Sequence, residues 1–479
     1  MKSWVEQEFA TLDMGDSRLN KRMKLIAARI SEAPCGSLQS AFRGWDEVIG
    51  AYRFFDNDRT TVKSIIAPHQ EATLTRIKEH ERVLLIQDTS ELDYTGKSKL
   101  KGTGPLSTVK RQGFFSHNHL VVTPERIPLG IWNTDIYARD ESEHGKNDQR
   151  KSKKIEQKES YRWLQGYRQA CRLAQLAPTT TVVSCSDREG DIYEVFDEWH
   201  QRREAVKPVA DWLIRGNQDR STVDEYGGRQ QRIWERVASS PLLGTADIQV
   251  KKQIQYKKDK KGSRKKHIRP ARLAHLEIRA TKVTLDPPYR PGTTLAEVSF
   301  QVVMAKEKHP PTDDDPVCWV LLTSLEVSGL GDALEILKLY SCRWEIEVFH
   351  YVLKSGCTVE ELQLKEDDRI KPAVALYMVI AWRVMYAMKL GRECPNLPCD
   401  LIFETDEWKA LWVIAYDYQA LEKKPSLGEF ILKVAEFGGY LGRKSDGPPG
   451  PKSIWIGMTR VRDFTLAWKH FQEKHPYPK

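Results

Sequence analysis

The chain has 479 residues, and its 75 Lys or Arg against 66 Asp or Glu give a formal net charge of +9. A hydrophobic content of 40% and a charged content of 29% are ordinary for a globular protein, here of about three domains. The longest apolar run, residues 373–382, stops at Arg383 and is shorter than the ~18 residues that a membrane span requires. The N-terminal residues lack the apolar core of a signal peptide. We therefore expect neither a membrane protein nor a secreted one.

Cysteine usage and charge distribution both carry information. The eight cysteines are scattered without a Cys-x-x-Cys pair, which favours reduced thiols in the cytoplasm over a disulfide framework or a zinc site. Residues 251–272 contain eleven Lys or Arg and one Asp, so this tract has a net charge of +10 and the rest of the chain −1. Such a tract is typical of an arm that binds a polyanion, and a solvated lysine-rich loop is the alternative.

Residues 1–75 have the pattern of a helical domain. Asp16 is a candidate N-cap, and apolar residues recur on one helical face from Leu19 onward. Arg18 and Arg22 belong to a basic stripe beside that face. The stripe is either a solvated helix surface or a set of phosphate contacts.

Residues 76–365 mix strand and helix patterns, which predicts an α/β domain. An apolar strand over 82–88 ends at Asp88, and a second one over 179–187 ends at Asp187. The other expected elements are a hairpin over 114–132, helices over 160–176 and 191–203, a β-rich insertion at about 205–312, a strand over 317–323 and one long helix over 330–355. Residues 366–479 are expected to form a helical C-terminal domain.

Two acids at strand ends suggest a metal site. An acid after a strand is more often a turn or helix cap, but Asp88 and Asp187 on neighbouring strands could share a hard divalent cation. Carboxylate oxygens are the ligands that Mg²⁺ prefers. The helix over 330–355 offers Glu347 as a third acid.

The same helix carries a row of other functional side chains. On a continuous helix, Tyr340, Arg343, Glu347 and Lys354 project within an arc of about 60°. An acid between two cations suits a metal-bound phosphodiester, because the cations can hold phosphates on either side. A solvated helix face with mixed charges is the alternative.

The spacing of these residues resembles that of a known protein family. The spacing Tyr340-x2-Arg343-x3-Glu347-x6-Lys354 is similar to the Tyr-Arg-Glu-Lys signature of DDE insertion-sequence transposases of the IS-four type, and in more detail to the cut-and-paste, Tn-five type. The segments Gln-Asp-Thr-Ser-Glu-Leu-Asp-Tyr around Asp88 and Ser-Asp-Arg-Glu-Gly-Asp-Ile-Tyr around Asp187 resemble the two aspartate motifs of that family. The resemblance covers nearly the whole chain. It implies an RNase H-like catalytic core with a β-sheet insertion, an N-terminal domain that binds transposon ends and a C-terminal dimerisation domain.

The activity that this resemblance implies is cut-and-paste transposition. The enzyme would bind inverted-repeat ends, nick the DNA, excise it through a hairpin intermediate and join the 3′-hydroxyl ends to target DNA. Asp88, Asp187 and Glu347 would hold two Mg²⁺ ions, with Mn²⁺ able to substitute. Two copies would form a homodimer in the synaptic complex, in the bacterial cytoplasm at the nucleoid and without a membrane partner.

The resemblance also assigns DNA contacts. A flipped base would stack on Trp319, although a tryptophan in a strand is usually a core residue. Asn217 stands where the family has a lysine, so contacts near Arg215 do not carry over fully. The residues with implied DNA contacts are Tyr340, Arg343, Lys354, Trp319, Arg215, Arg188, Arg18, Arg22 and Arg53.

Two other functions stay open. A catalytically inactive, transposase-derived DNA-binding protein would keep the basic residues, and a Mg²⁺ nuclease of the same fold would cut without joining. Nearby acids also compete with the predicted triad, and Glu345 lies about 200° round the helix from Glu347. These competing acids are Glu91, Asp93, Glu189, Asp191 and Glu345.

Overall fold

The computed structural model of the chain describes residues 3–34, 38–97, 100–108, 110–140, 153–224, 228–250, 253–258, 264–290, 292–311, 316–417 and 419–474. The chain divides into two compact units. Unit 1 comprises Met1–Asp148, Leu176–Thr180 and Trp344–Lys479, and unit 2 comprises Gln149–Gln175 and Thr181–Arg343. Both ends of the chain therefore belong to unit 1, and the predicted domains 76–365 and 366–479 each share residues with it.

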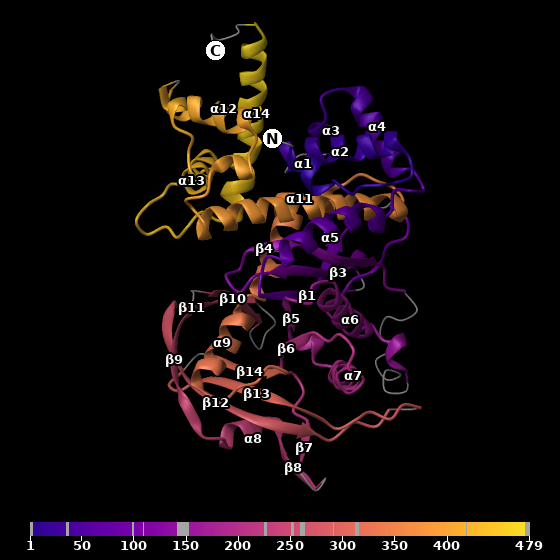
Figure 1. Cartoon of the computed structure of the whole chain (residues 1–479), viewed down its shortest axis with the longest axis vertical. Coiled ribbons are helices and arrows are strands. Elements are labelled where there is room, and N and C mark those ends of the chain that lie inside the picture. Colours follow the sequence, from indigo (N-terminus) through magenta and orange to yellow (C-terminus); the bar gives the residue numbers. More distant parts are fainter. Residues whose placement is uncertain are drawn as a thin grey trace. The chain divides into compact units, whose positions relative to one another are not determined.

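Unit 1 is built from helices at both ends of the chain and a small sheet between them in sequence. Its helices are α1 (Trp4–Glu8), α2 (Ser17–Glu32), α3 (Leu38–Ala41), α4 (Trp45–Phe55), α5 (Val62–Ile77), α10 (Trp344–Tyr351), α11 (Asp367–Glu393), α12 (Thr405–Ala415), α13 (Leu427–Phe437) and α14 (Pro451–Lys474) (Figure 1). The predicted helical character of residues 1–75 and of the C-terminal region is confirmed. Asp16 caps α2 as predicted, because its side chain accepts the backbone N–H of Arg18.

The sheet of unit 1 is antiparallel. Its strands are β1 (Arg82–Asp93), β2 (Gly104–Pro105), β3 (Gln112–Val122) and β4 (Pro128–Tyr137), and β3 pairs with the other three. The predicted hairpin is the β3–β4 pair. The prediction that a strand ends at Asp88 is wrong, because residues 89–93 continue the ladder against residues 113–117 of β3. Asp88 is therefore a mid-strand residue.

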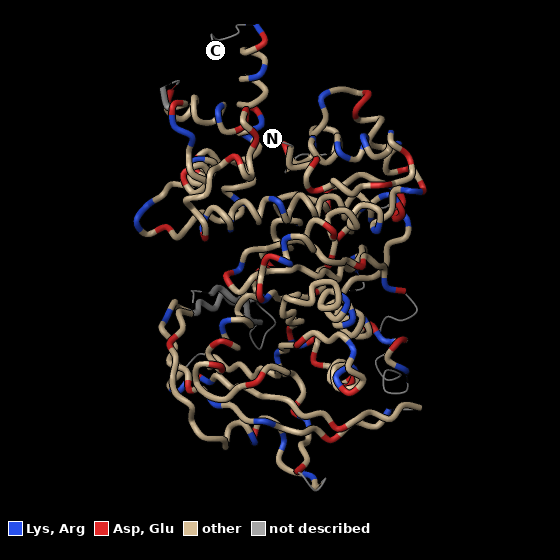
Figure 2. The backbone as a smooth tube through the Cα atoms, in the orientation of Figure 1, with Lys and Arg blue, Asp and Glu red and all other residues tan. Residues whose placement is uncertain are grey.

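Helix α11 forms the centre of unit 1. By length and composition it could cross a membrane, but 89% of its most apolar window is buried, which is typical of a core helix. It packs against α5 and β4, and Figure 2 shows an uncharged stretch along its middle. Arg383, which ends the apolar run 373–382 in the sequence, does not end the helix. Arg383 is buried inside the helix, where its guanidinium lies 4.7 Å from the ring centroid of Trp4.

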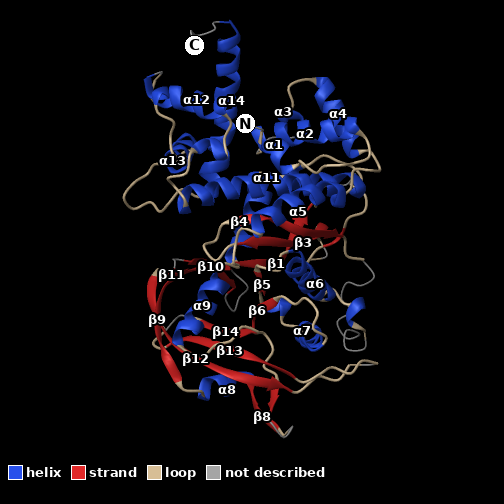
Figure 3. Ribbon diagram, in the orientation of Figure 1, coloured by secondary structure: helices blue, strands red, loops and turns tan. Residues whose placement is uncertain are grey.

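Unit 2 is rich in strands (Figure 3). Its helices are α6 (Tyr161–Leu176, whose last residue belongs to unit 1), α7 (Tyr193–Glu204), α8 (Ile233–Ser239) and α9 (Leu330–Ser341). Its strands are β5 (Thr181–Ser186), β6 (Asp211–Arg215), β7 (Ser221–Val223), β8 (Arg229–Arg232), β9 (Leu242–Val250), β10 (Gln253–Lys258), β11 (Arg264–Arg269), β12 (Arg272–Leu285), β13 (Val298–Glu307) and β14 (Cys318–Thr323). The predicted strands over 179–187 and 317–323 and the β-rich insertion are confirmed.

The sheet of unit 2 is mixed. Strands β5 and β6 are parallel, and β14, β13 and β12 extend the sheet from β6 as antiparallel neighbours. Strands β10 and β11 form a separate antiparallel pair within the basic tract 251–272, of which residues 251, 252 and 259–263 lie outside the described residues. Parallel strands with helices between them and antiparallel additions make the chain a mixed α/β protein, as predicted.

The long helix expected over 330–355 is two helices. It breaks at Cys342 and Arg343, whose backbone N–H groups bond to carbonyls three residues earlier instead of four. The side chains of Ser341 and Cys342 both bond to the carbonyl of Lys338, and such back-bonding competes with the helical ladder. After α10 the chain forms a π-helical turn, Val352–Gly356. The arc of about 60° worked out for a continuous helix therefore does not apply.

Candidate active site and DNA-binding residues

Asp88 lies on the middle of β1, directly opposite Asn118 of β3. It is half-buried, and one of its carboxylate oxygens accepts the backbone N–H of Thr89 at 2.8 Å. On the neighbouring rung, Thr89 Oγ1 lies 2.8 Å from Nδ1 of His117. The aspartate is thus held by a rigid antiparallel ladder and not by a flexible loop after a strand.

A buried polar network connects the strand pair to α10. Asn118 donates from Nδ2 to Nε2 of His350 at 3.0 Å. Its Oδ1 accepts the hydroxyls of Ser116 and Thr134 at 2.9 and 2.7 Å, which fixes the orientation of the amide. Because His350 is one helical turn after Glu347, this network places the Glu347 turn of α10 beside the Asp88 rung of β1. Sequence analysis missed Asn118 and His350, since 232 positions separate them in the chain.

The two glutamates of α10 have different surroundings. Glu345 is 1% exposed, and its carboxylate pairs with Nζ of Lys389 on α11 at 2.7 Å. Glu347 is half-buried on a different face of the helix. The prediction that both cannot enter one site holds within α10, and the ion pair identifies Glu345 as a structural acid.

Lys354 lies in the π-helical turn that follows α10. Its Nζ donates to the backbone carbonyl of Glu91 at 2.8 Å and lies 3.2 Å from a carboxylate oxygen of Glu360. π-Helical turns often occur at functional sites. The contact with Glu91 brings Lys354 to the same strand, β1, that carries Asp88.

In unit 2, Asp187 follows β5 directly, as predicted. Its carboxylate caps a short 3₁₀ helix, Arg188–Gly190, by accepting the backbone N–H of Glu189 at 2.8 Å. The competing acid Asp191 is buried and has another role. It accepts hydrogen bonds from the backbone N–H groups of Asn217 and Gln218 and pairs with Arg220. Asp191 therefore stabilises the fold, whereas Asp187 stays half-buried at the surface.

Three predicted DNA-contact residues meet close to the end of β6. Trp319 and Tyr340 lie edge to face with ring centroids 6.0 Å apart. Burial raises the pKa of Tyr340 to about 12, so it is a neutral hydrogen-bond donor at pH 7. Burial also lowers the pKa of Arg215. Tyr340 raises that pKa, and the positive charges of Arg188 and Arg343 lower it. Trp319 is half-buried, so part of its ring faces solvent.

The predicted end-binding arginines lie on α2 and α4. Arg18 and Arg53 are exposed, and Arg22 crosses to α4, where its guanidinium lies over Gly50. A Cβ at Gly50 would lie 2.0 Å from Nη1 of Arg22, so a larger residue there would displace the end of that side chain. By contrast, Arg29 of the same helix is held in a bidentate pair with Glu47.

Comparison with known protein families gives two matches. Residues 1–60 match the family described as transposase DNA-binding, and residues 379–472 match the transposase Tn5 dimerisation domain. The two matches support a transposase of the Tn5 type. The first match includes Arg18, Arg22 and Arg53. The second covers the later part of α11, all of α12 and α13, and α14 up to residue 472.

The segment that matches the Tn5 dimerisation domain has an apolar surface on its helices and on the loops between them. Several large apolar side chains there are exposed, among them Tyr416 at 54%, Leu441 at 67% and Phe471 at 62%. Exposed aromatic and aliphatic side chains are typical of protein–protein interfaces. The dimerisation match and this surface support formation of a homodimer, and the match over residues 1–60 supports DNA binding.

The predicted site residues divide between the units. Unit 1 brings Asp88, Glu347 and Lys354 to β1 and the adjoining helix, and unit 2 holds Asp187 with the Arg215 cluster. Among the described residues, no group of three or more His, Cys, Asp or Glu side chains could hold a metal ion. The seven described cysteines are free thiols.

Proposed function

We propose that the chain is a Mg²⁺-dependent cut-and-paste DNA transposase with an RNase H-like core and the IS-four-type signature. The observation that carries the proposal is the order of parts along the chain. A transposase DNA-binding match precedes the two aspartate motifs and the Tyr-Arg-Glu-Lys residues, and a Tn5 dimerisation match follows them. The strand-rich insertion between Asp187 and Glu347 is the one that the resemblance implies.

The catalytic acids in this proposal are Asp88, Asp187 and Glu347. Their donor set is purely carboxylate, which suits Mg²⁺ and also Mn²⁺. The bound metal would act as a Lewis acid on the attacking and leaving oxygens. The network of Asn118 and His350 supports the proposal for unit 1, because catalytic groups need rigid neighbours to hold them in place.

The remaining residues of the signature hold the DNA. Tyr340, as a neutral donor, and Arg343 and Lys354, as cations, contact phosphate oxygens near the cleaved bond. A water oxygen attacks the phosphorus and displaces the 3′-oxygen, which leaves as a 3′-hydroxyl. That hydroxyl attacks the opposite strand to form a hairpin, water reopens the hairpin, and the hydroxyl finally attacks target DNA. Each step forms one P–O bond and breaks another, so no covalent enzyme intermediate arises.

DNA recognition uses separate residues. Arg18, Arg22 and Arg53 contact the inverted-repeat ends, and Arg188 and Arg215 contact DNA near the reacting strand. A base flipped out of the hairpin stacks on Trp319. Two copies of the chain hold two ends in a synaptic complex, and the protein acts on the nucleoid in the cytoplasm.

The test is a cleavage assay with Mg²⁺ on a plasmid that carries the DNA flanking the gene. Wild type should release fragments with hairpin ends and join them to target DNA, whereas Asp187→Asn and Glu347→Gln should bind the ends without cutting them. Glu189→Gln, an exposed acid beside Asp187, is the matched control and should cut. Binding without cutting by wild type would instead indicate an inactive transposase-derived DNA-binding protein, and cutting without joining would indicate a nuclease.

A further inference from the structure

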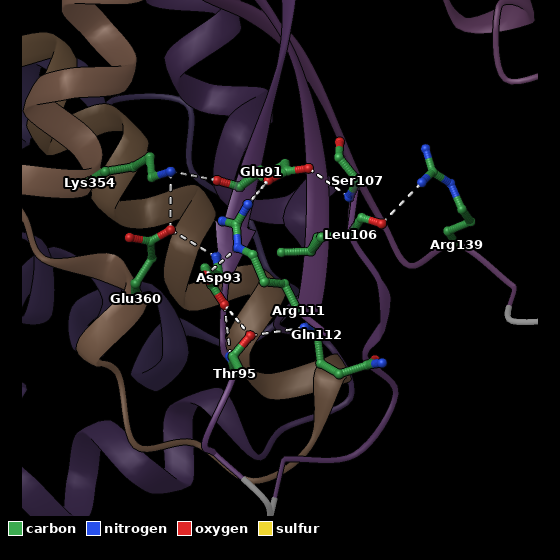
Figure 4. Close-up of polar contacts among 10 residues, drawn as sticks. All are labelled: Glu91, Asp93, Thr95, Leu106, Ser107, Arg111, Gln112, Arg139, Lys354 and Glu360. Atoms are coloured by element: carbon green, nitrogen blue, oxygen red, sulfur yellow. Dashed lines mark hydrogen bonds and ion pairs between the residues drawn. The ribbon is translucent and has the colours of Figure 1, made fainter. Parts of the chain in front are cut away.

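Lys354 of unit 1 lies at one end of a series of polar contacts (Figure 4). Oε1 of Glu360 lies 3.2 Å from Nζ of Lys354 in an ion pair, and the same oxygen accepts the backbone N–H of Asp93 at 2.7 Å. Lys354 also donates to the carbonyl of Glu91 at 2.8 Å. The ammonium is therefore held between a strand carbonyl and one carboxylate.

The other two acids of this region do not face the ammonium. Arg111 pairs with Glu91 through Nη1 at 2.6 Å and with Asp93 through Nε at 2.8 Å. Among the described residues, Glu360 is the one carboxylate in an ion pair with Lys354. An ammonium has three N–H donors. One of them bonds to the carbonyl of Glu91, and the side chain is 29% exposed, so another can point to solvent or to a ligand.

The side chain of Glu360 is not the main anchor of its segment. Tyr94 donates its hydroxyl to the carbonyl of Val359 at 2.9 Å, and Lys97 donates to the carbonyl of Glu361 at 3.4 Å. Glu360 lies in a 3₁₀ turn, Val359–Glu361. Both bonds hold this turn against the residues that follow β1, and neither uses the side chain of Glu360. Loss of the Glu360 carboxylate would therefore remove its ion pair with Lys354 and its hydrogen bond to the backbone N–H of Asp93, while these two anchors of the segment remain.

We propose that Glu360 is a positioning residue that orients Lys354 toward a DNA phosphate oxygen. This rests on the proposed function, in which Lys354 contacts the cleaved strand. Held by a hydrogen bond to the Glu91 carbonyl and an ion pair with Glu360, the ammonium stays in one place and loses little side-chain freedom when DNA binds. Glu360 does so at a cost, because its negative charge also weakens the attraction of Lys354 for phosphate.

These opposing effects give the role a distinctive signature. Removal of the side chain in Glu360→Ala should leave end-DNA affinity unchanged or slightly tighter, while the cleavage rate at saturating DNA falls by roughly 10- to 100-fold. Glu360→Gln keeps an acceptor oxygen and should cleave within about threefold of wild type. Glu361→Ala is the matched control, since that acid is 77% exposed and lies 3.9 Å from its partner Lys97.

A double variant separates positioning from a structural role. If Glu360 acts through Lys354, Glu360→Ala should have no further effect in a Lys354→Ala background. A further loss in that background, or an unchanged cleavage rate in Glu360→Ala alone, would overturn the inference. If Lys354→Ala itself cleaves at the wild-type rate, the proposed function of Lys354 as a DNA contact is wrong.

A second measurement does not depend on cleavage. Acetylation of lysines in the full chain without DNA, followed by mass spectrometry, reports how firmly each ammonium is held. Lys354 should react several-fold faster in Glu360→Ala than in wild type, and Glu361→Ala should match wild type. Equal reactivity of Lys354 in all three proteins would overturn the inference even if the enzyme proves inactive.

Discussion

The buried carboxylate of Glu8 offers a quantitative test of what fastens α1 to α5. Arg76 of α5 binds it with two parallel hydrogen bonds of 2.9 Å, and Nδ1 of His69 lies 2.5 Å from Oε1. Nε2 of His69 accepts the backbone N–H of Ile131, so Nδ1 carries the hydrogen and the ring is neutral. Burial alone would raise the pKa of Glu8, but His69 and Arg76 outweigh it and lower that pKa from 4.5 to about 2.

This shift sets the size of the effect. Because one pKa unit corresponds to about 1.4 kcal/mol, the charged carboxylate stabilises the folded unit by about 3 kcal/mol more than its protonated form does. Glu8→Gln imitates the protonated form and should lose about this amount at pH 7. Because the pKa of Glu8 is lower in the folded chain than in the unfolded one, its carboxylate stabilises the fold fully above pH 4.5. This contribution disappears as the pH falls from 4.5 toward about 2. Burial also lowers the pKa of His69, so acid below pH 6.5 destabilises the unit further.

Hydrogen exchange measured by mass spectrometry suits this test, since a chain of two units need not unfold in one step. Amides of α1 and α5 should exchange roughly 100-fold faster in Glu8→Gln at pH 7, the equivalent of about 3 kcal/mol. Glu6→Gln is the control, because Glu6 is half exposed and its pair with Lys24 is worth less than about 1 kcal/mol. Equal exchange in the two variants would refute the reasoning.

Two further predictions concern DNA. Gly50→Ala should displace the guanidinium of Arg22 without harming the fold, since alanine favours a helix. It should weaken the binding of end DNA by up to about tenfold, or 1.4 kcal/mol. Unchanged affinity in a filter-binding or gel-shift titration would show that Arg22 does not contact the DNA. Trp319→Ala should slow hairpin formation by roughly 5- to 100-fold, the worth of one stacked base, while the first nick stays fast. Equal losses in both steps on a denaturing gel would instead show a packing role.

The elements that followed from the sequence are those with a local signal. The cap at Asp16, the β3–β4 hairpin and the strand before Asp187 all depend on neighbours in the chain. The end of β1 was misplaced because residues 89–93 are polar except for Leu92 and extend the strand by pairing with β3. The break at Cys342 was missed because back-bonding side chains do not disturb the apolar period.

At the site, too, the sequence alone could not separate the predicted triad from the acids that compete with it. Asp191 and Glu345 are structural because of ion pairs with Arg220 and Lys389, which lie 29 and 44 positions away. A sequence pattern cannot show which acid finds a distant cation. The orientation of Lys354 was unpredictable for a related reason, since it depends on a π-helical turn that the periodicity of the chain does not reveal.

The placement of α11 has a consequence for how the protein is made. Strand β4 and helix α5 leave the ribosome early, but the helix that covers them ends only at Glu393. At 5–20 residues per second, synthesis of the roughly 250 residues between β4 and the end of α11 takes about 10–50 s. Throughout that time the apolar faces of β4 and α5 lack their partner, so the growing polypeptide offers chaperones a binding surface. A message cut short before codon 367 would yield a product that never covers it.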